Sequence, residues 1–322
     1  MRDIPTNQIK KICFVRTGGS GDTGAFERAL RLCKRTQAEL SIVSVSEPPP
    51  EGVLSLLKSW GASAESVLGE QELSNELEAL VKSAKLQGVE AAFELLRGSA
   101  FLEIIRKVMR DEYNLLIKAA QPTRVIHQVL FGHLDRQLIR KCPCPVWIEK
   151  PSNRKRHDTI LAAVDPTPFL DHPDYDPLRE ELNTSILQFS LLLAQTEDAA
   201  FHVVHVWPFD LEMSLQTRTG LSDEVIAQVA ASIRKKHETA LKRLVAPFLG
   251  HITQMHVLKG TAGAEIARLA QTENADLIVM GTICRGGIEG LLIGNTAETV
   301  LDQVDCSVVA LKPRGFVSPV QA

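Results

Sequence analysis

The chain has 322 residues, which at roughly 150 residues per domain predicts two domains. Apolar residues make up 44% of the chain and charged residues 23%, so it can bury hydrophobic cores and is neither disordered nor fibrous. The formal net charge of −3 provides no excess of Lys and Arg to neutralise phosphates, which argues against a nucleic-acid partner.

The apolar runs and the cysteines give an indication of the cellular compartment in which the protein resides. The longest apolar runs are far shorter than the ~20 residues that cross a bilayer, so we expect no membrane insertion. The amino-terminal segment is polar and lacks the apolar region of a secretory signal. Six cysteines in so long a chain do not make a disulfide scaffold. These features predict a cytoplasmic protein.

Short apolar runs alternate along the chain with longer segments of helical period, a pattern typical of βα units in a parallel sheet. The first half predicts strands near Ile12–Val15, Leu40–Val45, Ala91–Leu95, Leu115–Ile117 and Pro145–Ile148. The second half predicts strands near Ile160–Val164, Phe201–Val206, Thr253–Leu258, Leu277–Met280 and Ser307–Leu311. We therefore predict an α/β protein with two doubly wound, five-stranded parallel-sheet domains. They span residues 1–150 and 157–322, joined by a hydrophilic linker at 151–156.

The two halves repeat one sequence pattern. The segment RGSAFLEI at 97–104 matches KGTAGAEI at 259–266, an offset of 162 residues, and the same offset places Gly132 on Gly294. The strands that open the two halves differ by a smaller offset. We infer that an ancestral module was duplicated and that the second copy carries an insertion, which we place at 167–176.

A glycine-rich loop follows the fourth predicted strand of the second half. Five glycines lie between Gly281 and Gly294, and Asn295 with Glu298 three residues later has the spacing of a helix N-cap. Free amides at a helix start favour a phosphate, and Arg285 could add a charged contact. A connection that only lets the chain turn fits the same residues, because a single glycine-rich loop is a weak signal.

The repeated halves, the segment Leu277–Lys312 and the strand end Ala163-Val164-Asp165 resemble the universal stress protein family. The likeness is greatest to tandem, UspE-type members, whose second copy shows the same GNTAE run that begins here at Gly294. The resemblance covers essentially the whole chain. It implies the HUP-like α/β fold, a stress-response role without catalysis, and pairing of the two domains through their final strands as a pseudo-dimer.

Members of this family that bind ATP carry G-x2-G-x9-G-[ST] after the fourth strand and an aspartate at the end of the first. Here Gly281, Gly294 and Asp165 match these positions, whereas Cys284 replaces the second glycine and Asn295 the hydroxyl residue. The resemblance therefore implies a degraded nucleotide or phosphate cradle in the second domain, with no certain cofactor and ATP as the candidate. Its ligand-binding residues would be Asp165, Gly281, Cys284, Arg285, Gly294, Asn295 and Thr296.

The first half departs further from the ATP signature. The offset of 162 puts Ala119, Pro122, Gly132 and His133 on the signature positions, and Arg16 stands where the aspartate would be. A guanidinium cannot accept hydrogen bonds from an adenosine group. We expect this half to have lost the nucleotide site and to serve as a packing partner.

An alternative function uses the loop Gly19–Gly24, which fits G-x-G-x-x-G between a predicted strand and a predicted helix, with Glu47 at the end of the next strand. This pattern would indicate an NAD-dependent enzyme. Against it, the turn is lengthened by Thr17-Gly18, and the second half has no counterpart.

Metal and catalytic hypotheses find little support in the sequence. Cys142 and Cys144 have no second cysteine pair, and the cluster at 171–176 fits a solvated loop. His202 and His205 lie on opposite faces of a strand and are poor partners for one metal.

We interpret His133 and His256 as satisfied structural histidines, and we expect no metal site and no catalytic residues. The amphipathic stretches Ser63–Leu86 and Glu224–Leu249 are expected to be helices that cover the sheets. A homodimer and a small phosphorylated ligand remain open as partners.

Overall fold

The computed structural model describes residues 9–19, 21–48, 52–53, 59, 70–121, 131–152, 154–166, 176–208, 222–282 and 294–321. The chain divides into two compact units. The first runs to Lys155 and also includes the C-terminal segment from Val317, while the second runs from Arg156 to Phe316. Among the described helices, none combines the length and the apolar character needed to cross a membrane.

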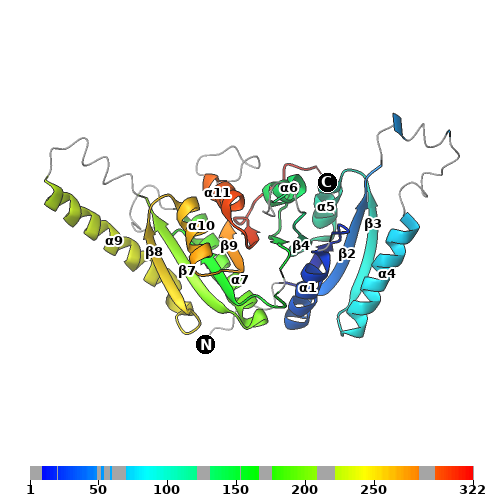
Figure 1. Ribbon diagram of the computed structural model, residues 1–322, viewed down its shortest axis with the longest axis horizontal. Coiled ribbons are helices and arrows are strands. Elements are labelled where there is room, and N and C mark those ends of the chain that lie inside the picture. The colour runs from blue at the N-terminus through cyan, green and yellow to red at the C-terminus, as the bar shows by residue number, and fades with distance from the viewer. Residues whose placement is uncertain are drawn as a thin grey trace. The chain divides into compact units, whose positions relative to one another are not determined.

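The first unit contains five parallel strands in the order β3-β2-β1-β4-β5. Their bounds are β1 Lys11–Val15, β2 Glu39–Ser46, β3 Ala91–Arg97, β4 Leu115–Ala119 and β5 Val146–Glu149. The helices described in this unit are α1 Asp22–Thr36, α4 Glu70–Leu86, α5 Ala100–Asp111 and α6 His133–Lys141. Figure 1 shows α4 lying alongside β2 and β3, which it contacts.

The second unit repeats this arrangement with the order β8-β7-β6-β9-β10. Its strands are β6 Thr159–Ala163, β7 Ala200–Trp207, β8 Gln254–Lys259, β9 Leu277–Gly281 and β10 Ser307–Leu311. Its described helices are α7 Pro177–Glu197, α9 Asp223–Val245, the short 3₁₀ helix η2 Ala246–Phe248, α10 Ala262–Thr272 and α11 Asn295–Gln303. Helix α10 packs on β7 and beside α11 (Figure 1).

The winding of each unit follows from the handedness of parallel crossovers, which are almost always right-handed. In the first unit the chain moves from β1 outward to β3 and then returns to β4 and β5 on the other side of β1. This reversal puts α1 and α4 on one face of the sheet and α5 and α6 on the other. The second unit reverses at β6 in the same way. The predicted α/β class, strand set and doubly wound topology are confirmed.

The cores explain why the strands read as continuous apolar runs. Parallel strands with helices on both faces are buried on both sides, so their apolar residues need not alternate with polar ones. Residues Ile12 to Phe14 of β1 and Leu277 to Val279 of β9 are completely buried. In the first unit, the Phe14 and Phe26 rings pack with their centroids 5.4 Å apart.

The duplication can be followed element by element. From β3 onward the offset of 162 residues places β4 on β9 and α6 on α11 without any shift in bounds. Between the first two strands of each unit, the second copy has a longer helix, since α7 has 21 residues and α1 has 15. The inserted residues therefore do not all lie in the loop before α7. Of the predicted insertion segment at 167–176, residues 167–175 lie outside the described residues.

Candidate functional site

The second sheet has a topological switch point between β6 and β9. These neighbouring parallel strands pair with Ala163 opposite Met280, and the chain leaves them toward opposite sides of the sheet. Asp165 lies two residues past the end of β6, and Gly281 is the last residue of β9. Two of the predicted site residues thus lie at the carboxyl edge, where ligands of such sheets bind.

Helix α7 fixes the backbone of Asp165. The Asp165 N–H donates to Asn183 Oδ1 at 2.9 Å, and Asn183 Nδ2 donates to the Asp165 carbonyl at 3.0 Å. The Asp165 side chain is 45% exposed, with Arg179 Nη1 at 3.8 Å from its carboxylate. The carboxylate therefore faces solvent on a backbone that is held from both sides.

A pair of buried histidines lies next to Asp165. His205 Nδ1 is 3.2 Å from the Val164 carbonyl and 4.0 Å from Asp165 Oδ1, and His205 Nε2 is 2.8 Å from His237 Nδ1. The His237 ring stacks on His205 and on Trp207. Burial lowers the pKa of His205, and burial together with His205 lowers the pKa of His237 to about 4. Both rings are neutral at pH 7, so they support this edge by packing and hydrogen bonding.

Gly281 is required for packing as well as for the loop that follows it. A Cβ at this position would lie 2.6 Å from Leu182 Cδ2 and 3.5 Å from Ile186 Cδ1, both on α7. No ligand is needed to explain this glycine. It lets helix α7 approach the end of β9 closely.

Helix α11 begins one residue earlier than the sequence pattern predicts. Gly294 is the N-cap, with φ −62° and ψ 146°, and Asn295 is the first helical residue. The prediction of Asn295 as N-cap is therefore wrong, because the Gly294 backbone already takes the extended cap conformation. Asn295 and Thr296 are exposed on the first turn. Cys284 and Arg285 lie outside the described residues.

In the first unit, the equivalent helix start is occupied by the protein itself. Gly132 is the N-cap of α6, and its N–H donates to Asp135 Oδ2 at 2.8 Å. Lys118 Nζ donates to Asp135 Oδ1 at 2.7 Å and to the Ala119 carbonyl at 2.7 Å. Lys118 and Asp135 are completely buried. A carboxylate of the protein itself therefore already accepts the N-cap N–H that an external anion could otherwise accept.

The carboxyl edge of the first sheet, just after β1, also lacks the hydrogen-bond acceptor that Asp165 provides in the second unit. Arg16, at the position equivalent to the strand-end aspartate, forms an ion pair with Glu76 of α4. Because the guanidinium is already engaged and cannot accept hydrogen bonds, this edge offers no counterpart to Asp165.

In the glycine-rich loop before α1, backbone N–H groups are likewise hydrogen-bonded to a side chain of the protein itself. Asp22 Oδ2 accepts the backbone N–H groups of Thr17 at 2.8 Å and of Gly18 at 2.7 Å. Glu47, which the dinucleotide hypothesis would place on a ribose, instead accepts the Ala100 N–H at the start of α5 at 2.7 Å. Both acidic groups serve local turns and helix ends, and this argues against a dinucleotide site here.

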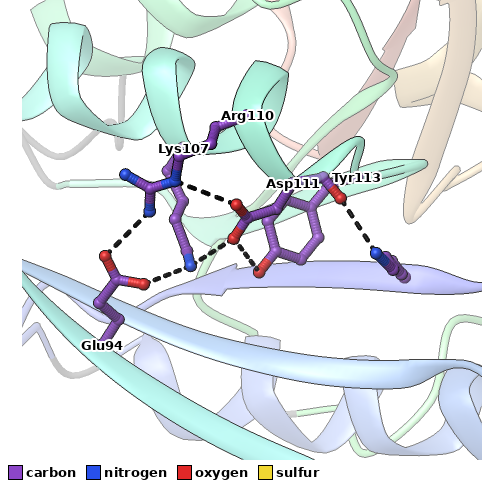
Figure 2. A network of polar contacts seen from close by, with 6 residues as sticks. Glu94, Lys107, Arg110, Asp111 and Tyr113 are labelled. Carbon is purple, nitrogen blue, oxygen red and sulfur yellow. Dashed lines mark hydrogen bonds and ion pairs between the residues drawn. The ribbon is translucent and has the colours of Figure 1, made fainter.

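A second charged network joins β3 to α5 in the first unit (Figure 2). Lys107 Nζ contacts a carboxylate oxygen of Glu94 and lies 2.5 Å from Asp111 Oδ2. Arg110 donates to Glu94 Oε1 at 3.0 Å and to Asp111 Oδ1 at 3.1 Å. Partial burial opposes ionisation of both acids, but hydrogen bonds from these cations leave the pKa of Glu94 and Asp111 lowered. The network balances two positive with two negative charges.

Four of the described cysteines, Cys13, Cys33, Cys142 and Cys144, are buried as free thiols. Burial raises the pKa of the Cys33 thiol to about 12. The Sγ atoms of Cys142 and Cys144 lie 3.6 Å apart where α6 ends and β5 begins. These thiols act as small apolar side chains, as expected for a segment that leads into a strand.

The histidines of β7 occur as predicted on opposite faces. His205 contacts His237 of α9, whereas the His202 ring lies 5.6 Å from that of His256 on β8. The interpretation of His256 as a satisfied histidine is wrong, since its buried Nε2 has no hydrogen-bond partner. His133 begins α6, with its Nε2 3.3 Å from Gln137.

The sequence carries no sign that Asn183 and His237 lie near Asp165, or that Trp207 stacks on His237. None of these residues belongs to a motif, and only the packing of α7, α9 and β7 brings them together. Of the acidic cluster at 171–176, only Asp176 is described, and it is the N-cap of α7.

The comparisons with known proteins agree with this fold. The model of the universal stress protein family matches residues 8–150 and 177–312. Universal stress protein E of Escherichia coli K12 is 30% identical over 221 residues, covering 69% of this chain and 67% of that protein. The protein of the same name from Photorhabdus laumondii is 28% identical over 221 residues, covering 68% of each chain.

Solved structures show the same architecture over nearly the full length. A Pseudomonas aeruginosa PAO1 protein described as functionally unknown gives a TM-score of 0.73 at 24% identity, covering 97% of this chain and 95% of that chain. A universal stress protein from Archaeoglobus fulgidus gives a TM-score of 0.60 at 15% identity, covering 94% and 98%. At these identities the likeness concerns the fold.

Proposed function

The chain belongs to the universal stress protein family, and from this premise we propose that it is a non-catalytic, cytoplasmic stress-response protein whose second unit binds a nucleotide or another small phosphorylated ligand. Binding would act by changing the stability of the unit or its choice of partner. ATP is the first ligand to test.

The observation that carries this proposal is a difference between two equivalent helix starts. In the first unit Asp135 accepts the Gly132 N–H at the start of α6 and is neutralised by Lys118. At the offset of 162 residues, the second unit has Ala297 and Met280 in their places. A methyl group accepts no hydrogen bond, so the start of α11 retains no equivalent of the internal carboxylate.

The chemistry of the edge suits a phosphorylated ligand. The amides of the α11 first turn, including those of Gly294, Asn295 and Thr296, and the positive end of the helix dipole favour phosphate oxygens. The half-exposed carboxylate of Asp165 can accept hydrogen bonds from a sugar or a base. We propose Gly281, Cys284 and Arg285 as further lining residues, with Arg285 supplying the charge.

Isothermal titration calorimetry of the full chain with ATP, and separately with NAD, tests this proposal. We expect ATP binding that Asp165→Ala weakens and that the double change Met280→Lys with Ala297→Asp, which copies the internal ion pair of the first unit, weakens by at least about tenfold. Gln303→Asp at the exposed end of α11 adds the same charge away from the site and should leave ATP binding unchanged.

Two outcomes would refute the proposal. One is wild-type protein that takes up no ATP. The other is NAD binding that is lost on Gly21→Glu, which would support the dinucleotide-dependent enzyme instead.

We further propose that the duplicated modules span residues 1–150 and 157–322, with 151–156 as linker, and that they pair within the chain through β5 and β10. Both strands are mostly apolar, with Glu149 at the end of β5, and lie at the end of their own five-stranded order. An uncovered apolar edge strand favours association, so pairing would protect both edges. The buried free thiols support a reducing compartment such as the cytoplasm.

A further inference from the structure

We propose that His202, His256 and Glu273 of the second unit form a binding site for a divalent transition-metal ion, with Zn²⁺ as the best match. This site goes beyond the proposed nucleotide cradle and is independent of it. It involves β7, β8 and the end of α10 rather than the residues after β6 and β9.

The three side chains converge from separate elements. His202 on β7 pairs with Gln254, and Val204 pairs with His256, so the two histidines lie on the same face of neighbouring strands. Glu273 directly follows α10. One ligand atom from each residue lies within 4.8 Å of the other two, and His202 Nδ1 is 3.8 Å from Glu273 Oε2.

Both imidazoles present a nitrogen without a hydrogen-bond partner. His202 Nδ1 and His256 Nε2 are buried and make no hydrogen bond. The His202 side chain is only 7% exposed. A buried polar atom without a partner is uncommon in folded proteins and calls for a group that would satisfy it, such as a water or an ion.

The first unit shows what occupies the equivalent place when no metal ligands are present. The offsets of the repeat put Ser41 at His202, Glu94 at His256 and Asp111 at Glu273. There the ammonium of Lys107 lies between Glu94 and Asp111 (Figure 2).

The second unit has replaced both cations of that network. Leu269 stands at the position of Lys107, and Thr272 at that of Arg110. One carboxylate is retained as Glu273 and the other has become His256, while His202 adds a third donor. An intrinsic cation has thus been exchanged for three groups that attract an external one.

The donor set selects the kind of ion. Two imidazole nitrogens and a carboxylate oxygen are typical of Zn²⁺ sites with an open fourth position, whereas Mg²⁺ and Ca²⁺ prefer oxygen ligands. Bonds of about 2.1 Å in a tetrahedral site place ligand atoms roughly 3.4 Å apart. The existing spacing therefore needs only small side-chain rotations to close around an ion.

Titration of the full chain with ZnCl₂ by calorimetry, with the visible spectrum of bound Co²⁺ as a second readout, tests the site. We expect one strong site per chain, weakened by at least about tenfold in His202→Asn and in Glu273→Gln, because each change removes a ligand. Leu269→Lys should have the same effect by restoring an ammonium like that of Lys107. Thermal unfolding without metal verifies that each variant folds.

His251→Asn removes an exposed imidazole and should leave zinc binding unchanged. The proposal is overturned if wild-type protein takes up no Zn²⁺. It is equally overturned if folded His202→Asn and Leu269→Lys bind Zn²⁺ as wild type does, or if His237→Gln rather than Glu273→Gln abolishes binding. The last result would assign the ion to the His205–His237 pair.

Discussion

Lys118 and Asp135 bring two opposite charges into the core of the first unit, both completely buried. Burial of charge is unfavourable unless the charges are paired and hydrogen-bonded, and here Gly132 N–H and the Ala119 carbonyl complete the set. The second unit manages without the pair at the same positions, with Met280 and Ala297. The pair is therefore not required by the fold.

Substituting one partner of this ion pair should destabilise the protein far more than substituting both together. Lys118→Met and Asp135→Ala each leave one buried charge unpaired, and we expect each to lower the free energy of unfolding by about 3–5 kcal/mol. The double variant copies the second unit and should lose no more than a single variant. Urea unfolding measures all three, and losses that simply add in the double variant would contradict this account.

The His205–His237 pair predicts a loss of stability in mild acid. The pKa of His237 is about 4 in the folded protein because of burial, whereas an unfolded histidine titrates near 6.5. The unfolded chain therefore takes up a proton first, so stability is complete above pH 6.5 and falls as the pH drops from 6.5 toward 4.

When the pH is lowered from 7.5 to 5.0, the protonation of His237 in the unfolded chain should reduce the free energy of unfolding by about 2 kcal/mol. Urea denaturation at both pH values measures this difference. His237→Gln cannot take up the proton and should show a correspondingly smaller difference. An unchanged pH dependence in that variant would refute the assignment.

At the scale of elements, the repeated RGSAFLEI and KGTAGAEI segments connect a strand to a helix in the same way. Gly98 and Gly260 have φ of +134° and +148°, which side chains rarely adopt. A Cβ would lie 3.1 Å from Cγ of Glu103 in the first unit and 2.9 Å from Cγ of Glu265 in the second. In both copies the position thus needs glycine, because of its backbone conformation and because the glutamate five residues later packs against it.

Gly260→Ala should destabilise the second unit by about 1–3 kcal/mol, since it adds backbone strain and forces Glu265 aside. Gly250→Ala is the matched control, because a Cβ there meets nothing within 4 Å. Thermal unfolding of the two variants compares them directly. Equal melting temperatures would show that the turn tolerates a side chain.

At the scale of the whole molecule, the two units have the same strand order and nearly constant offsets, as duplication of one module requires. The copies differ in their polar groups. The first has internal ion pairs, Lys118 with Asp135 and Lys107 with Glu94 and Asp111, at two places where the second has Met280 and Leu269 instead of the lysines. We infer that the second copy is the one specialised for external ligands.

The proposed pairing of β5 with β10 can be measured in solution. Small-angle X-ray scattering of the full chain should give a pair-distance distribution with a single maximum, as expected for two units joined along a sheet edge. Arg or Lys substitutions on the apolar faces are unsuitable as tests because they would unfold the units. Two resolved maxima, typical of well-separated lobes, would contradict the pairing.

The sequence by itself determined the family, the α/β class, the duplicated module and the position of the ten strands found in the described residues. These follow from local periodicity and from motifs whose members are close in the chain, such as Gly98 with Glu103. It also located Asp165 and the start of α11 to within one residue. Such features depend on residues that are close to one another in the chain, and the sequence shows these residues directly.

Only the tertiary structure decided which distant side chains meet. His202 with His256 and Glu273, His205 with His237, and Asp135 with Lys118 are joined across different elements. Whether a buried polar atom has a partner depends on strand register and on helix packing, and single residues carry no signal of either. For this reason His256 has the pattern of an ordinary strand residue in the sequence, whereas the fold shows that its buried Nε2 has no hydrogen-bond partner.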